Sequence, residues 1–144
     1  MKQALQILIV FMAFLFLSCE KDGLNYTERQ IVGSWDYTKV KYTENWSFSS
    51  SNKTYDYEDV QLEFKPNFTA HFLNTFTGAT GTGLWELTQT NTNEQVVNTI
   101  YASFTNDESG ELSQIVFENA TINNNRIHAY YQDNDGRYRY VLEK

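Results

Sequence analysis

Apolar and polar residues alternate along most of the chain after its first 30 residues. The clearest case is 59–76: Val60, Leu62 and Phe64 alternate with polar residues before Pro66-Asn67, and Phe68, Ala70, Phe72 and Phe76 continue the alternation after it. A period of two is typical of half-buried strands, and a Pro-Asn pair favours a turn. The segment therefore predicts a β-hairpin.

Similar patterns continue to the end of the chain, separated by residues that favour turns. Besides the hairpin, strands are predicted at 33–43, 84–88, 96–104, 112–122, 126–132 and 137–143. Glycines at 78, 81 and 83 indicate a turn. A polar loop is expected at 89–94, and a bulge is expected near Asn119. Segment 44–58 stays open between strand and loop. Before the strands, Thr27 and Gln30 have the spacing of a capping box, which predicts one or two helical turns.

These elements predict an all-β fold: a single antiparallel up-and-down barrel of about eight strands, preceded by a short helical turn. Closure into a barrel removes the exposed strand edges. Such an interior can be filled by side chains or can hold one small ligand. We expect it to be mostly filled, with a modest cavity. The rings expected largely inside are Phe64, Phe68, Phe72, Phe76, Phe104, Phe117, Tyr131, Tyr138 and Tyr140.

The first residues have the pattern of a secretory signal: Lys2, then an apolar run from 7 to 17 that is too short to span a membrane. Ser18 then precedes Cys19, the single cysteine. This junction resembles the lipobox of bacterial lipoproteins. The resemblance implies a signal peptide at 1–18 and a lipidated cysteine and tether at 19–26, so the predicted barrel domain comprises 27–144. It also implies anchoring in the outer membrane, on its periplasmic or cell-surface face. The alternative is an ordinary secretory signal with a free thiol.

Composition excludes some classes of partner. The chain has 11 basic and 18 acidic residues, a net charge of −7. Nucleic-acid binding needs basic clusters that neutralise phosphates, so we expect no nucleic-acid partner. An aromatic content of 16% instead indicates a packed domain.

Gly33-Ser34-Trp35, at the start of the first long strand, resembles the Gly-x-Trp motif of lipocalins. The later Phe64–Phe68 hairpin and Gly83-Leu84-Trp85 resemble the lipocalin-like domains of bacterial lipoproteins. In lipocalins the tryptophan plugs one barrel end, often under an arginine from the last strand. The resemblance therefore implies a plug of Gly33, Trp35 and Arg139, with Arg137 as the other candidate for the cation.

The resemblance implies non-catalytic binding of a small apolar ligand, and no enzymatic activity. The candidate pocket wall is Phe72, Trp85, Tyr131 and Tyr140. The alternative is a filled barrel that binds a protein partner through loops 44–58 and 89–94. Its exposed patch would comprise Trp46, Phe48, Tyr55 and Tyr57.

Catalytic and metal chemistry finds little support in the sequence. His71 and His128 both fall on the polar side of their strands, which predicts surface positions. The run 133–136 resembles the opening of a calcium loop, but a strand follows where the loop needs a glutamate. Asp-Gly there favours a hairpin turn. The acidic pairs at 58–59 and 107–108 are expected in solvated strand ends. We expect no catalytic residue, metal or cofactor.

Overall fold

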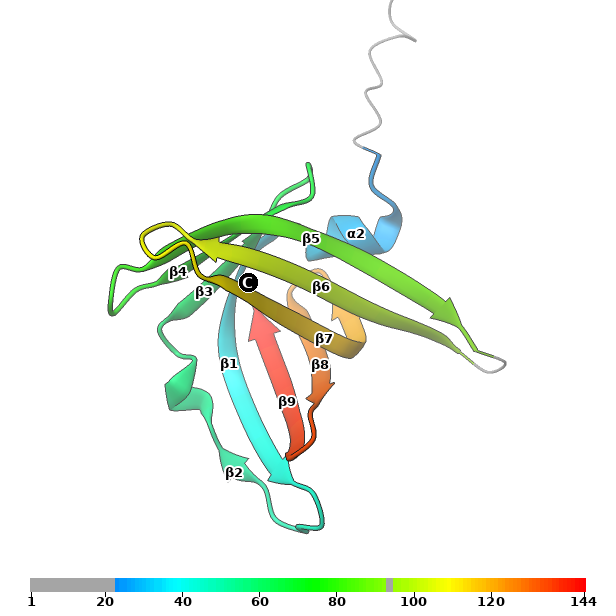
Figure 1. The fold of residues 1–144 in the computed structure, drawn as a ribbon. Helices are drawn as coiled ribbons and strands as arrows, with labels where there is room; N and C mark the ends of the chain where they lie inside the picture. Colours follow the sequence, from blue (N-terminus) through cyan, green and yellow to red (C-terminus); the bar gives the residue numbers. More distant parts are fainter. Residues whose placement is uncertain (1–22, 93–94) are drawn as a thin grey trace, which may run out of the picture.

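The computed structural model describes residues 23–92 and 95–144. They form one antiparallel sheet in the order β2-β1-β3-β4-β5-β6-β7-β8-β9. Strand β1 also pairs with β9, which closes eight strands into a barrel and leaves β2 as an extra strand outside it (Figure 1). The predicted up-and-down barrel is therefore confirmed. The elements are α2 (Tyr26–Ile31), β1 (Gly33–Glu44), β2 (Ser51–Asn52), a 3-10 turn η1 (Thr54–Asp56), β3 (Val60–Phe64), β4 (Thr69–Asn74), β5 (Thr80–Asn91), β6 (Val96–Asn106), β7 (Leu112–Asn123), β8 (Arg126–Gln132) and β9 (Gly136–Glu143).

The N-cap of helix α2 lies two residues before the predicted cap. Asn25 is the N-cap: its side chain accepts from the Glu28 backbone N–H, and the Glu28 carboxylate accepts from the Asn25 N–H. The predicted box of Thr27 and Gln30 was wrong, because the helix is capped two residues earlier and Asn25 and Glu28 form the box instead. Leu24 is also buried against the barrel, so residues expected in the tether belong to the fold.

The hairpin of β5 and β6 is longer than predicted. The polar loop expected at 89–94 begins later than predicted, because β5 continues to Asn91 and its polar residues pair with β6 as far as Val96. The glycines Gly81 and Gly83 lie inside β5 rather than in the turn before it. At both positions the missing side chain allows a neighbouring group to approach closely.

The interior is filled mainly by large apolar side chains. Phe64, Phe104, Phe117 and Ile100 are almost completely buried. Phe76 is an exception to the predicted inward set: it is 84% exposed, because β4 ends at Asn74 and the chain turns there. The core therefore agrees with a mostly filled barrel.

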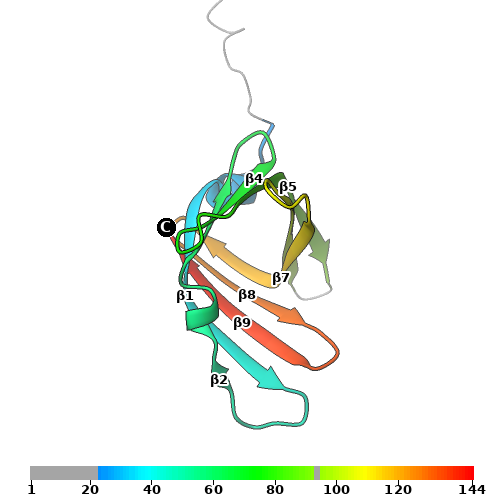
Figure 2. The same cartoon turned by 60° about the vertical axis from the view of Figure 1, so that its left-hand side comes forward.

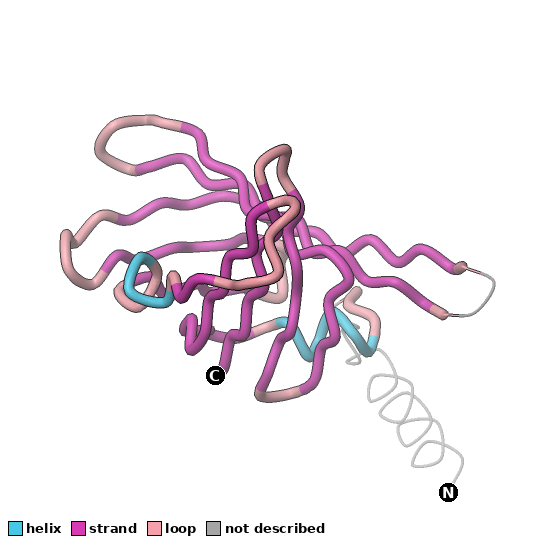
Figure 3. Tube along the Cα trace, turned by 90° about the horizontal axis from the view of Figure 1, so that it is seen from below, coloured by secondary structure: helices cyan, strands magenta, loops and turns pink. Residues whose placement is uncertain are grey.

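Segment 44–58 is a loop with little regular structure. β2 has two residues that pair with Lys41 and Tyr42, and η1 follows it (Figure 2). Trp46 and Phe48 are fully exposed within this loop. The loop lies at the far end of β1 from α2, whereas the C-terminus lies near α2 (Figure 3).

Candidate ligand-binding site

One end of the barrel is closed by Trp35. Its ring is completely buried, and its Nε1 donates to the Ile31 carbonyl oxygen at 2.6 Å. The ammonium of Lys144 lies 4.7 Å from the ring centroid and donates to the carbonyls of Gln30 and Val32. These contacts join the end of α2, the start of β1 and the C-terminus.

The cation over Trp35 differs from the prediction. The prediction that Arg139 covers Trp35 was wrong: Arg139 pairs across the sheet with Lys41 and Tyr130 and is exposed. The other candidate, Arg137, lies over the Tyr130 ring at 5.4 Å. Both arginines alternate with inward tyrosines and so point outward. Lys144 reaches Trp35 because it follows the last strand at the closed end.

Gly33 lies beside Lys144 at this end of the barrel. Its φ of 134° is a conformation that favours glycine, and a Cβ there would lie 2.9 Å from the Lys144 Cε. A side chain at this position would therefore displace the lysine from the tryptophan.

Toward the other end, the barrel opens between β7 and β8. β6 pairs with β7 from Leu112 to Phe117, whereas β8 pairs with β7 only from Glu118 onward. The register shifts between Glu118 and Thr121, where Asn119 has a φ of 48°. This confirms the predicted bulge. Among the described strands, the first half of β7 therefore has a partner on one side only.

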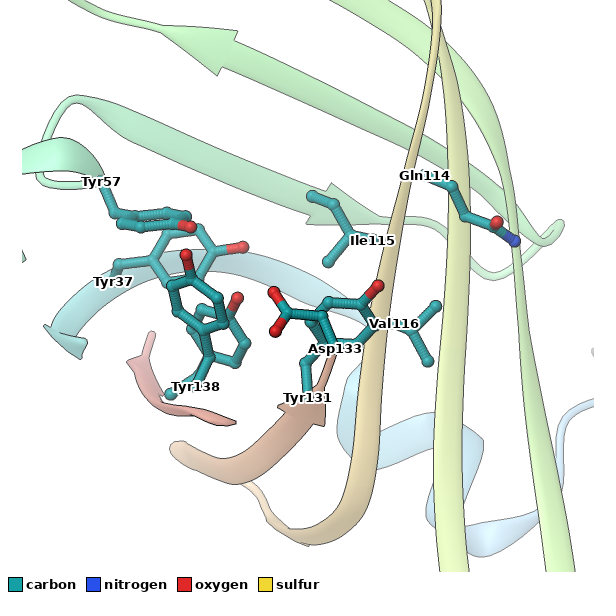
Figure 4. A pocket seen from close by; sticks show the side chains of 9 residues that line it. Tyr37, Tyr57, Gln114, Ile115, Val116, Tyr131, Asp133 and Tyr138 are labelled. Atoms are coloured by element: carbon teal, nitrogen blue, oxygen red, sulfur yellow. The ribbon is translucent and has the colours of Figure 1, made fainter. Parts of the chain in front are cut away.

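A pocket of about 340 Å³ occupies this opening (Figure 4). Its volume lies within the range typical of small-molecule sites. Three consecutive residues of β7 line it, and since their side chains alternate between faces, the pocket runs along the strand edge. Its lining residues are Tyr37, Tyr57, Gln114, Ile115, Val116, Tyr131, Asp133, Tyr138 and Tyr140.

The tyrosine rings of the pocket pack against one another. The Tyr37 ring centroid lies 5.1 Å from that of Tyr57 and 5.8 Å from that of Tyr140. Tyr138 and Tyr140 stack with centroids 5.8 Å apart, and Tyr131 lies 6.5 Å from Tyr138. The rings thus form a rigid wall that carries hydroxyl groups.

Burial strongly affects the acidity of this wall. It raises the pKa of Tyr37 far above 10.0, and the neighbouring Tyr57 raises it further. Burial, followed by Tyr57, also raises the pKa of Tyr140 well above 10.0. The pKa of Tyr138 is raised by burial and then by Tyr57 and Asp133. The hydroxyls of these three tyrosines therefore remain neutral donors and acceptors near neutral pH.

Two of the four predicted pocket residues line the pocket, Tyr131 and Tyr140. Trp85 does not: it is 2% exposed, and its Nε1 donates to the Lys65 carbonyl. It faces a separate hollow of about 300 Å³ beside Phe68. Phe72 packs edge-to-face on Phe104, with centroids 5.5 Å apart. The rings of Trp85 and Phe72 point inward as expected, but they lie at a different level along the barrel axis from the pocket.

The sequence prediction did not include Tyr37, Tyr57, Tyr138 and Asp133 as pocket residues. Tyr37 follows Trp35 by two positions, so alternation alone would place both inside the barrel. Tyr138 has the same relation to Tyr140. The positions of Tyr57 and Asp133 depend on the loop 44–58 and on the β8–β9 turn, for which the sequence gives no inward signal.

Of the remaining chemical candidates, the two histidines lie apart from the pocket, whereas Asp133 of the run 133–136 lines it. His71 is half-buried on β4 beside Thr82, and His128 is half-buried on β8 opposite Thr121. The run 133–136 forms the predicted turn, in which the Asp133 N–H donates to the Gly136 carbonyl at 3.0 Å. Across residues 23–92 and 95–144, no group of three metal-ligating side chains occurs.

Comparison of the chain with protein-family models, curated proteins and solved structures gave no match. Cys19 and the residues before it, which resemble a lipobox, lie outside the described residues. In the part of the chain that is described, no helix has the length and apolar character needed to cross a membrane.

The burial of Tyr37 predicts a loss of stability in alkali. Above about pH 10 the unfolded chain loses this proton and the folded protein keeps it, so the free energy of unfolding falls as the pH rises. One such group contributes up to about 1.4 kcal/mol per pH unit. Urea unfolding between about pH 9 and pH 11 measures the slope. Tyr37→Phe should reduce it, whereas Tyr55→Phe, at an exposed tyrosine, should not. Equal slopes in the two variants would contradict the prediction.

Proposed function

We propose that the protein is a membrane-anchored lipoprotein that binds a small molecule without catalysing a reaction. The observation that carries this proposal is the tyrosine-lined pocket, which lies beside a core of almost completely buried side chains. Its volume is suitable for one small ligand. Ile115, Val116 and the tyrosine rings provide apolar surface for the body of the ligand, and the hydroxyls orient it.

The lipid anchor rests on the sequence around Cys19. One cysteine cannot form an internal disulfide, and acylation gives this thiol a function. Each buried methylene of an acyl chain contributes about 0.8 kcal/mol to membrane binding, so several chains together hold a domain firmly. We place the anchor in the outer membrane, on its periplasmic or cell-surface face.

The fold is compatible with an anchor at this position. The described chain begins beside α2, whereas the β8–β9 turn and the end of β1 lie at the opposite end of the barrel (Figure 1). Asp133 of the pocket belongs to that turn. A ligand can therefore reach the pocket from the side away from the tether.

Native mass spectrometry of the protein, purified gently in mild detergent, tests the proposal. We expect a bound small molecule that is released on denaturation, and an intact mass that shows acyl chains on Cys19. Ile115→Trp should fill the pocket and remove the bound molecule. Leu112→Trp, on an exposed residue of the same strand, should retain it. An apo mass for the unmodified protein would count against ligand binding.

A second candidate function is binding of a protein partner through the loop 44–58. Trp46 and Phe48 are fully exposed there, and Tyr55 is 78% exposed. Exposed aromatic side chains of this kind are enriched at protein interfaces. Tyr57, the fourth residue of the expected patch, instead lines the pocket. This function would be favoured if the protein carries no small molecule but binds a protein partner, and if the double variant Trp46→Ala, Phe48→Ala no longer binds that partner.

A further inference from the structure

The polar groups of the pocket are almost all oxygen atoms. Figure 4 shows the side-chain oxygens of Tyr37, Tyr57, Tyr138 and Asp133 facing the same space. None of the nine lining residues is a lysine, an arginine or a histidine. The site therefore offers a carboxylate and neutral hydroxyl oxygens, without a positive charge to balance them.

The carboxylate of Asp133 is fixed by its own turn. Its Oδ1 accepts hydrogen bonds from the backbone N–H groups of Asp135 and Gly136, at 2.9 and 2.7 Å. Its Oδ2 makes no hydrogen bond to any described residue. One oxygen thus holds the side chain in place, and the other remains available to a ligand.

The hydroxyl of Tyr37 is accessible from the pocket, although most of its ring is buried. Its side chain is 5% exposed, and no hydrogen bond joins its hydroxyl to another described group. No buried side-chain nitrogen or oxygen of the described residues lacks a hydrogen-bond partner, so this unbonded hydroxyl must open onto accessible space. Since Tyr37 lines the pocket, a ligand or water inside it is the available partner.

We infer that the ligand of this pocket carries a positively charged ammonium group, which binds the Asp133 carboxylate and the tyrosine hydroxyl oxygens. An ammonium group has three donors and no acceptor, which matches an oxygen-lined site. Hydrogen bonds between ionised partners are roughly twice as strong as neutral ones. The net charge of −7 also attracts cations to the protein. This inference rests on the proposed function and adds the chemical class of the ligand.

Three molecules of similar shape test the inference by isothermal titration of the full mature protein in detergent. They are 2-phenylethylammonium, the neutral 2-phenylethanol and the anionic 3-phenylpropionate. We expect the ammonium compound to bind about tenfold more tightly than the alcohol, a difference of about 1.4 kcal/mol. The anion should bind most weakly.

Two asparagine variants separate the charge of Asp133 from its structural role. Asp133→Asn keeps the Oδ1 acceptor of the turn, so the fold is retained while the preference for the ammonium compound falls to about threefold or less. Asp135→Asn removes the same charge from an exposed residue outside the pocket lining and should keep the preference. Circular dichroism checks the fold of both variants.

Each other outcome overturns the inference. Equal binding of the ammonium compound and the alcohol would show that the positive charge of the ligand does not contribute to binding. Tighter binding of the anion would show that the pocket prefers a negative charge. An equal loss in the two asparagine variants would assign the preference to the overall charge of the protein. If none of the three molecules binds, the ammonium inference fails. The proposed function fails separately, when the native mass shows no bound molecule.

Discussion

Replacement of Trp35 by alanine should destabilise the protein by about 3–5 kcal/mol, as expected for a fully buried large aromatic residue. The substitution leaves a cavity at the closed end of the barrel. It also removes the hydrogen bond to the Ile31 carbonyl and the ring beneath Lys144. Urea unfolding followed by circular dichroism measures the free energy of unfolding.

Trp46→Ala is the matched control, because it makes the same substitution at a fully exposed tryptophan. Surface substitutions of this kind usually change stability by no more than about 0.5 kcal/mol. Lys144→Met adds a second comparison: it keeps an apolar stem and removes the charge over the ring. Its effect should be about 0.5–1 kcal/mol. If Trp35→Ala and Trp46→Ala have similar stability, Trp35 does not plug the barrel.

The barrel could be predicted from the sequence because its signals are local. Alternation with a period of two identifies each strand, and turn residues such as those at 133–136 end it. Pairing of neighbours in the chain then follows from short turns. Closure of β1 on β9 needs no further motif, since an eight-stranded sheet with right-handed twist can remove both edges in this way.

The pocket could be predicted only in part, because alternation gives the side of a strand and not the height along the barrel. Tyr131, Tyr140, Phe72 and Trp85 all point inward, yet only the two tyrosines reach the opening. That height depends on register between distant strands. The bulge near Asn119 was predicted, but its consequence, the separation of β7 from β8, was not visible in the sequence.

The cation of the plug shows a related limit. The last strand contains Arg137 and Arg139, and the resemblance to lipocalins implied that one of them covers Trp35. The alternation of the same strand places both outside, next to inward Tyr138 and Tyr140. Lys144 lies beyond the end of the strand, so the pleat of the strand does not set the direction of its side chain. Its ammonium group can therefore lie over the ring of Trp35.

Glycines in this chain have two roles that look the same in the sequence. Gly78 and Gly110 adopt positive φ in turns, at 75° and 70°. Gly81 and Gly83 instead lie within β5, where a Cβ would collide with the Phe72 ring and with the Ser103 carbonyl, respectively. A turn and a close approach both require glycine, so the distinction needs the neighbouring strands.

Replacement of Gly83 by alanine is the most informative test of this close approach. The added methyl would overlap the Ser103 backbone carbonyl, which belongs to the paired strand β6 and cannot rotate away as a side chain can. The strands must therefore separate. Overpacking usually costs about 1–3 kcal/mol, and we expect a loss at or above the upper end because the obstacle is backbone.

Leu84→Ala is the control for Gly83→Ala, since it alters the adjacent residue on the exposed face of the same strand. Its stability should stay within about 0.5 kcal/mol of the unmodified protein. Urea unfolding gives both values, and hydrogen exchange of β5 and β6 amides shows where the damage lies. If Gly83→Ala is as stable as Leu84→Ala, the two strands can move apart without loss, and β5 and β6 are not held at their observed spacing by the glycine.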